Sequence, residues 1–149
     1  MALISSIPAV TATLPDGAER FLGLPAADAV DLRQAVRQGL PFSALEALSQ
    51  QLELSPQQCA LLLGIPARTV ARRKEARQLN PQESDRLYRL ARATAQAVAV
   101  LGSLDHARLW FRAPNRALAC DRPLDLLDTD IGARQVEEVL LRLNYGIFS

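Results

Sequence analysis

Residues 55–78, SPQQCALLLGIPARTVARRKEARQ, decide the fold. Ser55 can cap a helix that begins at Pro56, because a serine side chain accepts from free amide groups at a helix start and proline suits the first position. Gly64 tolerates the positive φ that a tight reversal between two helices requires, and Ala60 is small enough for those helices to approach closely. The stretch therefore predicts a helix-turn-helix.

The positive charge of the chain is concentrated in the second half of this stretch. Residues 67–79 carry five basic residues and one acid, whereas residues 1–66 have a net charge of −3 and residues 80–149 a net charge of 0. A short basic segment in an otherwise balanced chain is typical of contact with a polyanion. A solvent-exposed basic helix face gives the same pattern, so the charge alone leaves both interpretations open.

The second predicted helix has one narrow apolar stripe, around Val70. Arg68 and Arg72 lie one turn apart on another face, near the helix start, which is the part that enters the major groove in this motif. Arg73 stands where the motif usually has an apolar residue, so either the helix sits differently or Leu79 supplies the missing packing. The residues predicted to contact DNA are Arg68, Thr69 and Arg72 at base edges and Arg73, Lys74 and Arg77 at phosphates.

Helix signals dominate the rest of the chain as well. Asn80, Pro81 and Glu83 form a second capping sequence, and the helix that they open carries an apolar stripe that continues to Leu101. No segment alternates as a half-buried strand does, so the fold class is all-α. Further helices are predicted over residues 104–111, over 123–127 and around the apolar stripe at 136–143, the last one ending near Tyr145 with Gly146 in a left-handed conformation.

These signals divide the chain into three parts. Residues 1–23 contain two prolines and little periodicity, so we expect a flexible extension that the fold does not require. Residues 24–79 form a helical DNA-binding region that contains the helix-turn-helix. Residues 80–149 form a second, small helical domain.

Two features indicate a cytoplasmic protein. No charge-free stretch reaches the length of a bilayer-spanning helix, and the amino end lacks the basic residues of a secretory signal. Cys59 and Cys120 have no partner motif, which is typical of buried thiols in a reducing compartment. We therefore expect no membrane partner.

Sites for catalysis, metals or cofactors are not indicated. His106 is the single histidine and forms no recognisable zinc site with two distant cysteines. Asp121, Asp125, Asp128 and Asp130 crowd one region, but no Glu follows Asp128 at the spacing of a calcium loop, and helix capping explains Asp128 and Asp130. With no glycine-rich phosphate loop and no Ser/His/Asp set, we expect neither catalytic residues nor a metal nor a cofactor.

Residues 145–149, Tyr-Gly-Ile-Phe-Ser, follow the last predicted helix and carry large apolar side chains where a chain end is usually polar. Such a segment either folds back into the core or inserts into the cleft of a partner. The residues alone favour the core.

From about Leu52 to Ser149 the sequence resembles the Xre/MbcA/ParS antitoxins, which are partners of RES-domain toxins. Several blocks occur in the order of that family. They are RTVARRK at 68–74, Leu79, ESDRL at 83–87, ARLWF at 107–111, Pro114-Asn115, Ala117-Leu118, PLDLL at 123–127, Gly132 and LNYGIFS at 143–149.

The resemblance implies an antitoxin that represses its own operon by binding operator DNA and that neutralises a RES-domain toxin. It also implies that the toxin consumes NAD and that the last residues of the antitoxin block the NAD cleft. Carried onto this sequence, the toxin-binding residues are Tyr145, Gly146, Ile147, Phe148 and Ser149, whose terminal carboxylate would face cationic groups. No cofactor is implied for the antitoxin itself.

Two alternatives to the antitoxin stay open at this point. One is a stand-alone helix-turn-helix transcriptional regulator whose C-terminal domain dimerises or senses a small ligand. The other, a small enzyme, is disfavoured by the lack of a catalytic set. A homodimer is expected for the antitoxin because helix-turn-helix proteins commonly use two-fold symmetry to bind palindromic half-sites.

Overall fold

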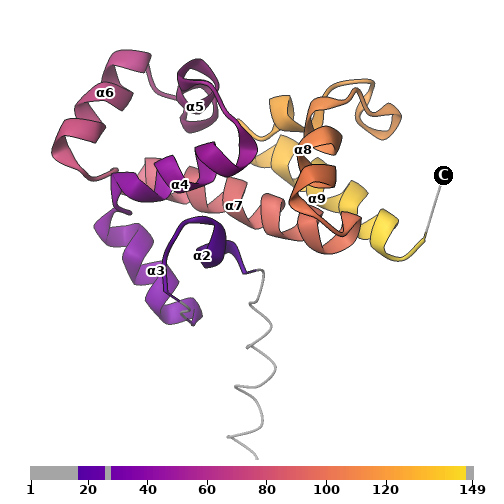
Figure 1. The fold of residues 1–149 in the computed structure, drawn as a ribbon, viewed down its shortest axis with the longest axis horizontal. Coiled ribbons are helices and arrows are strands. Elements are labelled where there is room, and N and C mark those ends of the chain that lie inside the picture. The colour runs from indigo at the N-terminus through magenta and orange to yellow at the C-terminus, as the bar shows by residue number, and fades with distance from the viewer. Residues whose placement is uncertain (1–16, 26–27, 147–149) are drawn as a thin grey trace, which may run out of the picture.

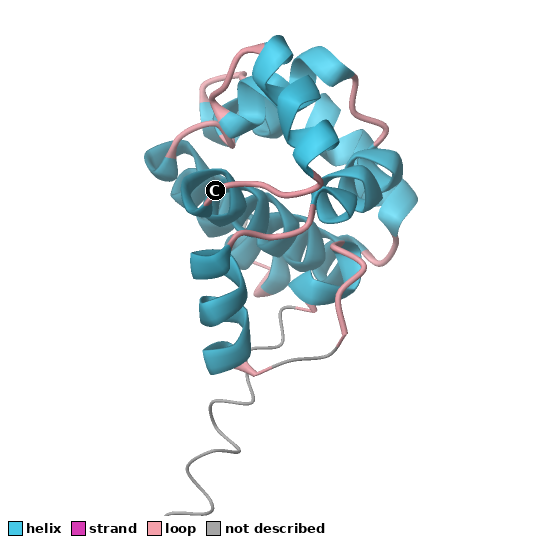
Figure 2. Cartoon of the chain, turned by 90° about the vertical axis from the view of Figure 1, so that its left-hand side faces the viewer, coloured by secondary structure: helices cyan, strands magenta, loops and turns pink. Residues whose placement is uncertain are grey.

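The computed structural model describes residues 17–25 and 28–146, and in that part of the chain every regular element is a helix (Figures 1 and 2). The predicted all-α fold class is confirmed. Among the described helices, none is both long and apolar enough to cross a membrane. The α-helices are α2 (Ala18–Phe21), α3 (Ala29–Gln38), α4 (Phe42–Leu52), α5 (Pro56–Leu63), α6 (Ala67–Ala76), α7 (Pro81–Leu101), α8 (Leu104–Arg112) and α9 (Asp130–Asn144), and the 3-10 helices are η1 (Arg116–Leu118) and η2 (Pro123–Leu126).

Helix α7 forms the centre of the molecule. It is 21 residues long, and α2, α3, α5, α8 and α9 all pack against it. Its predicted apolar stripe is buried at Leu87, Leu90, Ala91 and Thr94, and small alanines on the same helix allow neighbouring helices to approach closely. In Figure 1, α7 runs through the middle, with α6 beyond one end and α8 and α9 beside the other.

Both predicted capping sequences form in full. Ser55 Oγ accepts from the backbone N–H of Gln58 at 3.1 Å, and Gln58 Oε1 accepts from the backbone N–H of Ser55 at 2.9 Å. Asn80 and Glu83 make the same reciprocal pair, at 2.8 and 3.0 Å. The helix starts predicted at residues 56 and 81 are thus confirmed, because each box satisfies backbone donors that a helix start leaves free.

The start of α9 depends on Thr129 and Gly132. The hydroxyl of Thr129 accepts from the backbone N–H of Gly132 at 3.0 Å, so Thr129 caps α9, and the capping role predicted for Asp128 and Asp130 is wrong. Asp130 lies in the first turn and pairs instead with Arg134 at 3.0 Å. Thr129 is the N-cap because its hydroxyl accepts from the backbone N–H three residues further along, at Gly132.

The substitution Gly132→Ala should destabilise the fold by about 2 kcal/mol, because the added methyl carbon would lie 1.9 Å from the carbonyl oxygen of Leu126. Urea unfolding followed by circular dichroism measures this change. Gly102→Ala is the matched control, since its methyl group meets nothing within 4 Å and it should cost only about 1 kcal/mol for the positive φ. Equal losses in the two variants would contradict the tight contact between η2 and α9.

The extension predicted over residues 1–23 is too long. Residues 1–16 lie outside the described residues, but α2 begins at Ala18, and Ala18, Phe21 and Leu22 are buried in the core. Gln51 Nε2 on α4 donates to the carbonyl oxygen of Phe21 at 2.8 Å. Two adjacent large apolar residues pack well even in a helix of one turn, and such a short helix leaves no periodic signal in the sequence.

The two cysteines differ in their surroundings. Cys59 is buried, and burial raises the pKa of its thiol, despite opposing hydrogen bonds from Ser49 and from the Cys59 backbone. Cys120 is exposed at a left-handed backbone position after η1, so the prediction of a buried thiol is wrong for Cys120. Its position in a surface turn explains the exposure.

Candidate nucleic-acid interface and C-terminal segment

Helices α5 and α6 are joined by a turn at Gly64 whose backbone conformation favours glycine. Gly64 has φ +69°, and a Cβ atom there would lie 2.3 Å from Nη1 of Arg86. Arg86 needs that space because its Nη1 donates to the carbonyl oxygen of Leu63 at the end of α5, at 2.7 Å. The geometry is that of a helix-turn-helix, with α6 as the second helix.

Four of the six residues predicted to contact DNA are exposed: Arg68, Arg72, Lys74 and Arg77, on α6 or just after it. Arg68 and Arg72 share one face of the helix, whereas Lys74 borders the groove beside Val70 on another face. Helix α6 lies at the opposite end of the molecule from the end of α9 (Figure 1).

Thr69, unlike these four residues, is not exposed. Its side chain is buried, with 7% of the residue exposed, and its Oγ1 accepts from Nη2 of Arg72 at 3.2 Å. The predicted contact of Thr69 with a base edge does not fit this position. Thr69 instead supports the side chain of Arg72, while Val70 is only partly buried, in a groove of about 300 Å³ between α4, α5 and α6. The sequence pattern alone does not separate these two neighbours, since both have small β-branched side chains.

Arg73 makes an ion pair that the sequence did not predict. Its Nε donates to Oε1 of Glu83 at 2.8 Å, and Glu83 is 2% exposed. Burial raises the pKa of Glu83, but the hydrogen bonds from Arg73 and from the Asn80 backbone, with the positive charges of Arg73 and Arg86, hold that pKa below its usual value. Arg73 is partly exposed and only its Nε is engaged by Glu83, so the phosphate contact predicted for Arg73 stays a prediction.

The unusual arginine within the motif thus has a specific explanation. Both the ion pair and Leu79, which is 2% exposed, supply the packing that an apolar residue would otherwise give. Glu83 was predicted from the sequence only as a helix cap. Its second role depends on the way α6 folds back toward α7, which residue spacing does not reveal.

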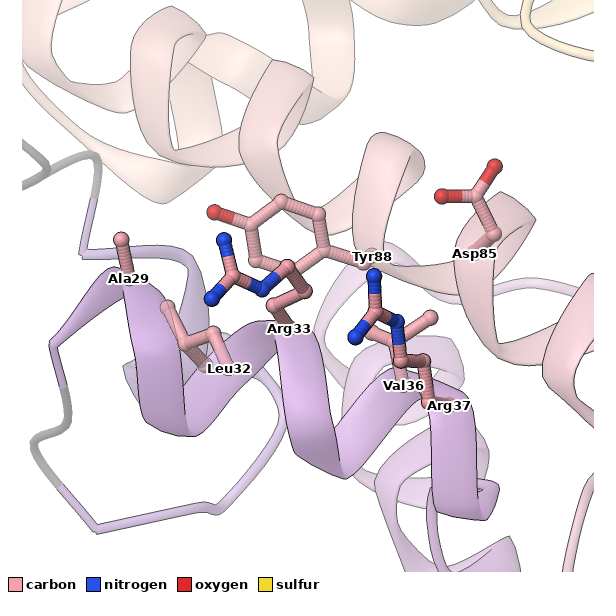
Figure 3. Close-up of a pocket in the computed structure, with 7 residues that line it drawn as sticks. All are labelled: Ala29, Leu32, Arg33, Val36, Arg37, Asp85 and Tyr88. Atoms are coloured by element: carbon pink, nitrogen blue, oxygen red, sulfur yellow. The ribbon is translucent and has the colours of Figure 1, made fainter.

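A cleft of about 360 Å³ lies between α3 and α7, away from the predicted site residues (Figure 3). The guanidinium groups of Arg33 and Arg37 lie on the same side as the ring of Tyr88, with Leu32 and Val36 lining the α3 wall (Figure 3). Within the described residues, no cluster of His, Cys, Asp and Glu is arranged to hold a metal ion.

The C-terminal segment begins at an exposed position. Helix α9 ends at Asn144, Tyr145 is 73% exposed, and Gly146 has the predicted left-handed φ, at +69°. The residues alone favour packing of this segment into the core. For Tyr145 that prediction is wrong. Ile147, Phe148 and Ser149 lie outside the described residues.

Helix α9 also exposes apolar side chains that the sequence prediction missed. Ile131 is 73% exposed and Leu141 is 48% exposed. The buried stripe of α9 contains Val136, Val139 and Leu140. Leu141 lies outside this stripe, because each residue turns the helix by about 100°. The exposure of Leu141 could therefore have been predicted from its spacing in the sequence.

Comparison with protein families assigns both halves of the chain. Residues 31–92 match the antitoxin Xre-like helix-turn-helix domain, and residues 96–146 match the antitoxin Xre/MbcA/ParS C-terminal toxin-binding domain. The chain belongs to the Xre/MbcA/ParS family of antitoxins. The two matches meet within α7, so the first half of this helix belongs to the helix-turn-helix unit, whereas the sequence signals place a domain boundary at residue 80.

Similar proteins carry the same family name. A protein named Antitoxin Xre from Yersinia enterocolitica is 29% identical over 87% of this chain and 89% of its own length. Another Antitoxin Xre, from Pseudomonas putida, is 42% identical over 55% of this chain and 52% of its own length. The crystal structure of the M. tuberculosis MbcT–MbcA toxin–antitoxin complex contains a chain that is 29% identical, with a TM-score of 0.54, over 72% of this chain and 96% of that chain.

Proposed function

We propose that this antitoxin neutralises a RES-domain, NAD-consuming toxin by blocking its active site with residues 145–149, and that it represses its own operon through α5 and α6. The observation that carries the proposal is the separation of two unlike ends. A basic helix lies at one end of α7, and an exposed aromatic residue inside the region that matches a toxin-binding domain lies at the other.

The exposed end of α9 supports the proposal that apolar side chains of the antitoxin fill the active-site cleft of the toxin. Tyr145 extends from α9 into solvent, and the following residues include Ile147 and Phe148. A large apolar side chain gains about 1.5–3 kcal/mol when a cleft removes it from water. Two or three such side chains suffice to occupy a nucleotide cleft tightly, without any chemical reaction by the antitoxin.

The DNA end supports operator binding. Arg68 and Arg72 lie within the first six residues of α6, and their planar guanidinium groups suit bidentate hydrogen bonds to guanine. Lys74 and Arg77 lie further along and suit phosphate oxygens. We propose that a homodimer presents two such helices to a palindromic operator, since that arrangement doubles both kinds of contact.

The proposed function is tested by expressing the chain together with the neighbouring gene for a RES-like protein and measuring cellular NAD. Expression of the neighbour alone should lower NAD, and expression with the antitoxin should restore NAD to the level of uninduced cells. NAD that still falls in the presence of a co-purifying complex would contradict active-site blocking. The absence of a RES-like neighbour would favour the stand-alone regulator.

A further inference from the structure

The first two turns of α7 hold both helices of the helix-turn-helix. Glu83 Oε1 accepts from Nε of Arg73 on α6 at 2.8 Å, and Arg86 Nη1 donates to the carbonyl oxygen of Leu63 on α5 at 2.7 Å. Glu83 and Arg86 are three residues apart, so they project from neighbouring turns of one helix face. Helix α6 packs mainly against α5, and the ion pair connects it to α7.

The Glu83 carboxylate is held in an unusual environment for a charge. The residue is 2% exposed, and its Oε2 accepts no hydrogen bond from the described residues. Removing a carboxylate from water is costly, and a buried ion pair is often no more stabilising than apolar residues of similar volume. A role in fixing geometry accounts for this arrangement better than a role in stability.

We infer that Glu83 is a positioning residue that sets the rotation of the recognition helix α6 by holding Arg73, and that it thereby determines how well operator DNA is distinguished from other DNA. The inference rests on the proposed binding of α6 to the operator. A planar guanidinium donates in a fixed direction, so the bond from Arg73 Nε fixes α6 about its own axis.

This rotation matters for base contacts more than for phosphate contacts. At about 100° per residue, the orientation of Arg73 determines where Arg68 and Arg72 point. A bidentate contact to a base edge tolerates little misplacement, whereas attraction to the phosphate backbone depends mainly on charge. Loss of the Arg73–Glu83 ion pair should therefore lower affinity for the operator and leave affinity for unrelated DNA intact.

The test compares operator and unrelated duplexes by fluorescence anisotropy at several salt concentrations. Glu83→Gln keeps the size of the side chain and the Oε1 acceptor that both the backbone N–H of Asn80 and Nε of Arg73 use, but it removes the charge that holds the Arg73 guanidinium. We expect it to lower the ratio of operator to unrelated affinity about tenfold, with unrelated affinity unchanged or raised and toxin neutralisation retained. Glu137→Gln is the matched control, because it breaks the Arg92–Glu137 pair between α7 and α9, at 2.7 Å, and should leave the ratio unchanged.

Arg73→Lys is a second variant that keeps a cation beside Glu83 and so avoids leaving the buried carboxylate unpaired. Lysine lacks the planar donor, so the ratio should again fall, with the salt dependence of binding unchanged. An unchanged ratio in Glu83→Gln or Arg73→Lys would overturn the inference, and so would a rise of both affinities in Glu83→Gln, since that would make Arg73 a phosphate contact. A wild-type protein with no preference for its operator would instead contradict the proposed function, and the inference with it.

Discussion

Ending the chain at Asn144, without Tyr145–Ser149, should abolish protection against the toxin while leaving operator binding within about twofold of the wild type. Tyr145 follows the last turn of α9 and is 73% exposed, so the core does not depend on its side chain. Loss of two buried apolar side chains corresponds to about 3–6 kcal/mol, or roughly 10²–10⁴-fold in affinity for the toxin. Growth and NAD in cells that express the toxin, with operator binding of purified protein, measure both effects.

A substitution that preserves length separates apolar burial from the mere presence of the segment. The double variant Ile147→Ser with Phe148→Ser should lose most of the protection, because serine gains little from leaving water. Leu61→Ser is the matched control, since Leu61 is 71% exposed on α5 and its loss should leave protection intact. Full protection by the truncated chain would exclude blocking by this segment.

The sequence predicted those elements whose signals are local. Capping boxes involve residues three positions apart, so the starts of α5 and α7 follow from the sequence, as does the reversal at Gly64. Helix α2 was missed because one turn is too short to show a period. The burial of Phe21 is decided by α4 and α7, which lie far away in the sequence.

The candidate DNA surface was predicted only in part, for the same reason. Exposure of Arg68 and Arg72 follows from their spacing on α6, whereas the pairing of Arg73 depends on Glu83, ten residues further along. An arginine at a usually apolar position indicates that an acidic partner is needed. Which residue is that partner depends on the angle between α6 and α7. The apolar character of residues 145–149 is evident from the sequence, but their proposed place in a toxin cleft comes from the family resemblance, because periodicity gives no information beyond the end of a helix.

The double variant Arg68→Ala with Arg72→Ala should reduce operator affinity by about 10²–10³-fold and lower the slope of log affinity against log salt by about 2. Each arginine removed takes away one base or phosphate contact and the counterion release that accompanies it. Electrophoretic mobility shifts at several salt concentrations measure the affinity and the slope together. Protection against the toxin should persist, because α6 lies at the other end of the molecule from the end of α9 (Figure 1).

A second pair of arginines with the same spacing provides the control for net charge. Arg33 and Arg37 lie one turn apart on α3 and are exposed, so their replacement by alanine removes the same charge from a different surface. If α6 contacts the operator directly, this control should reduce affinity by less than about threefold at physiological salt, where charges beyond about 8 Å are largely screened. Equal losses of operator affinity in the two double variants would mean that affinity depends on the net charge of the protein. Direct contact between α6 and the operator would then be contradicted.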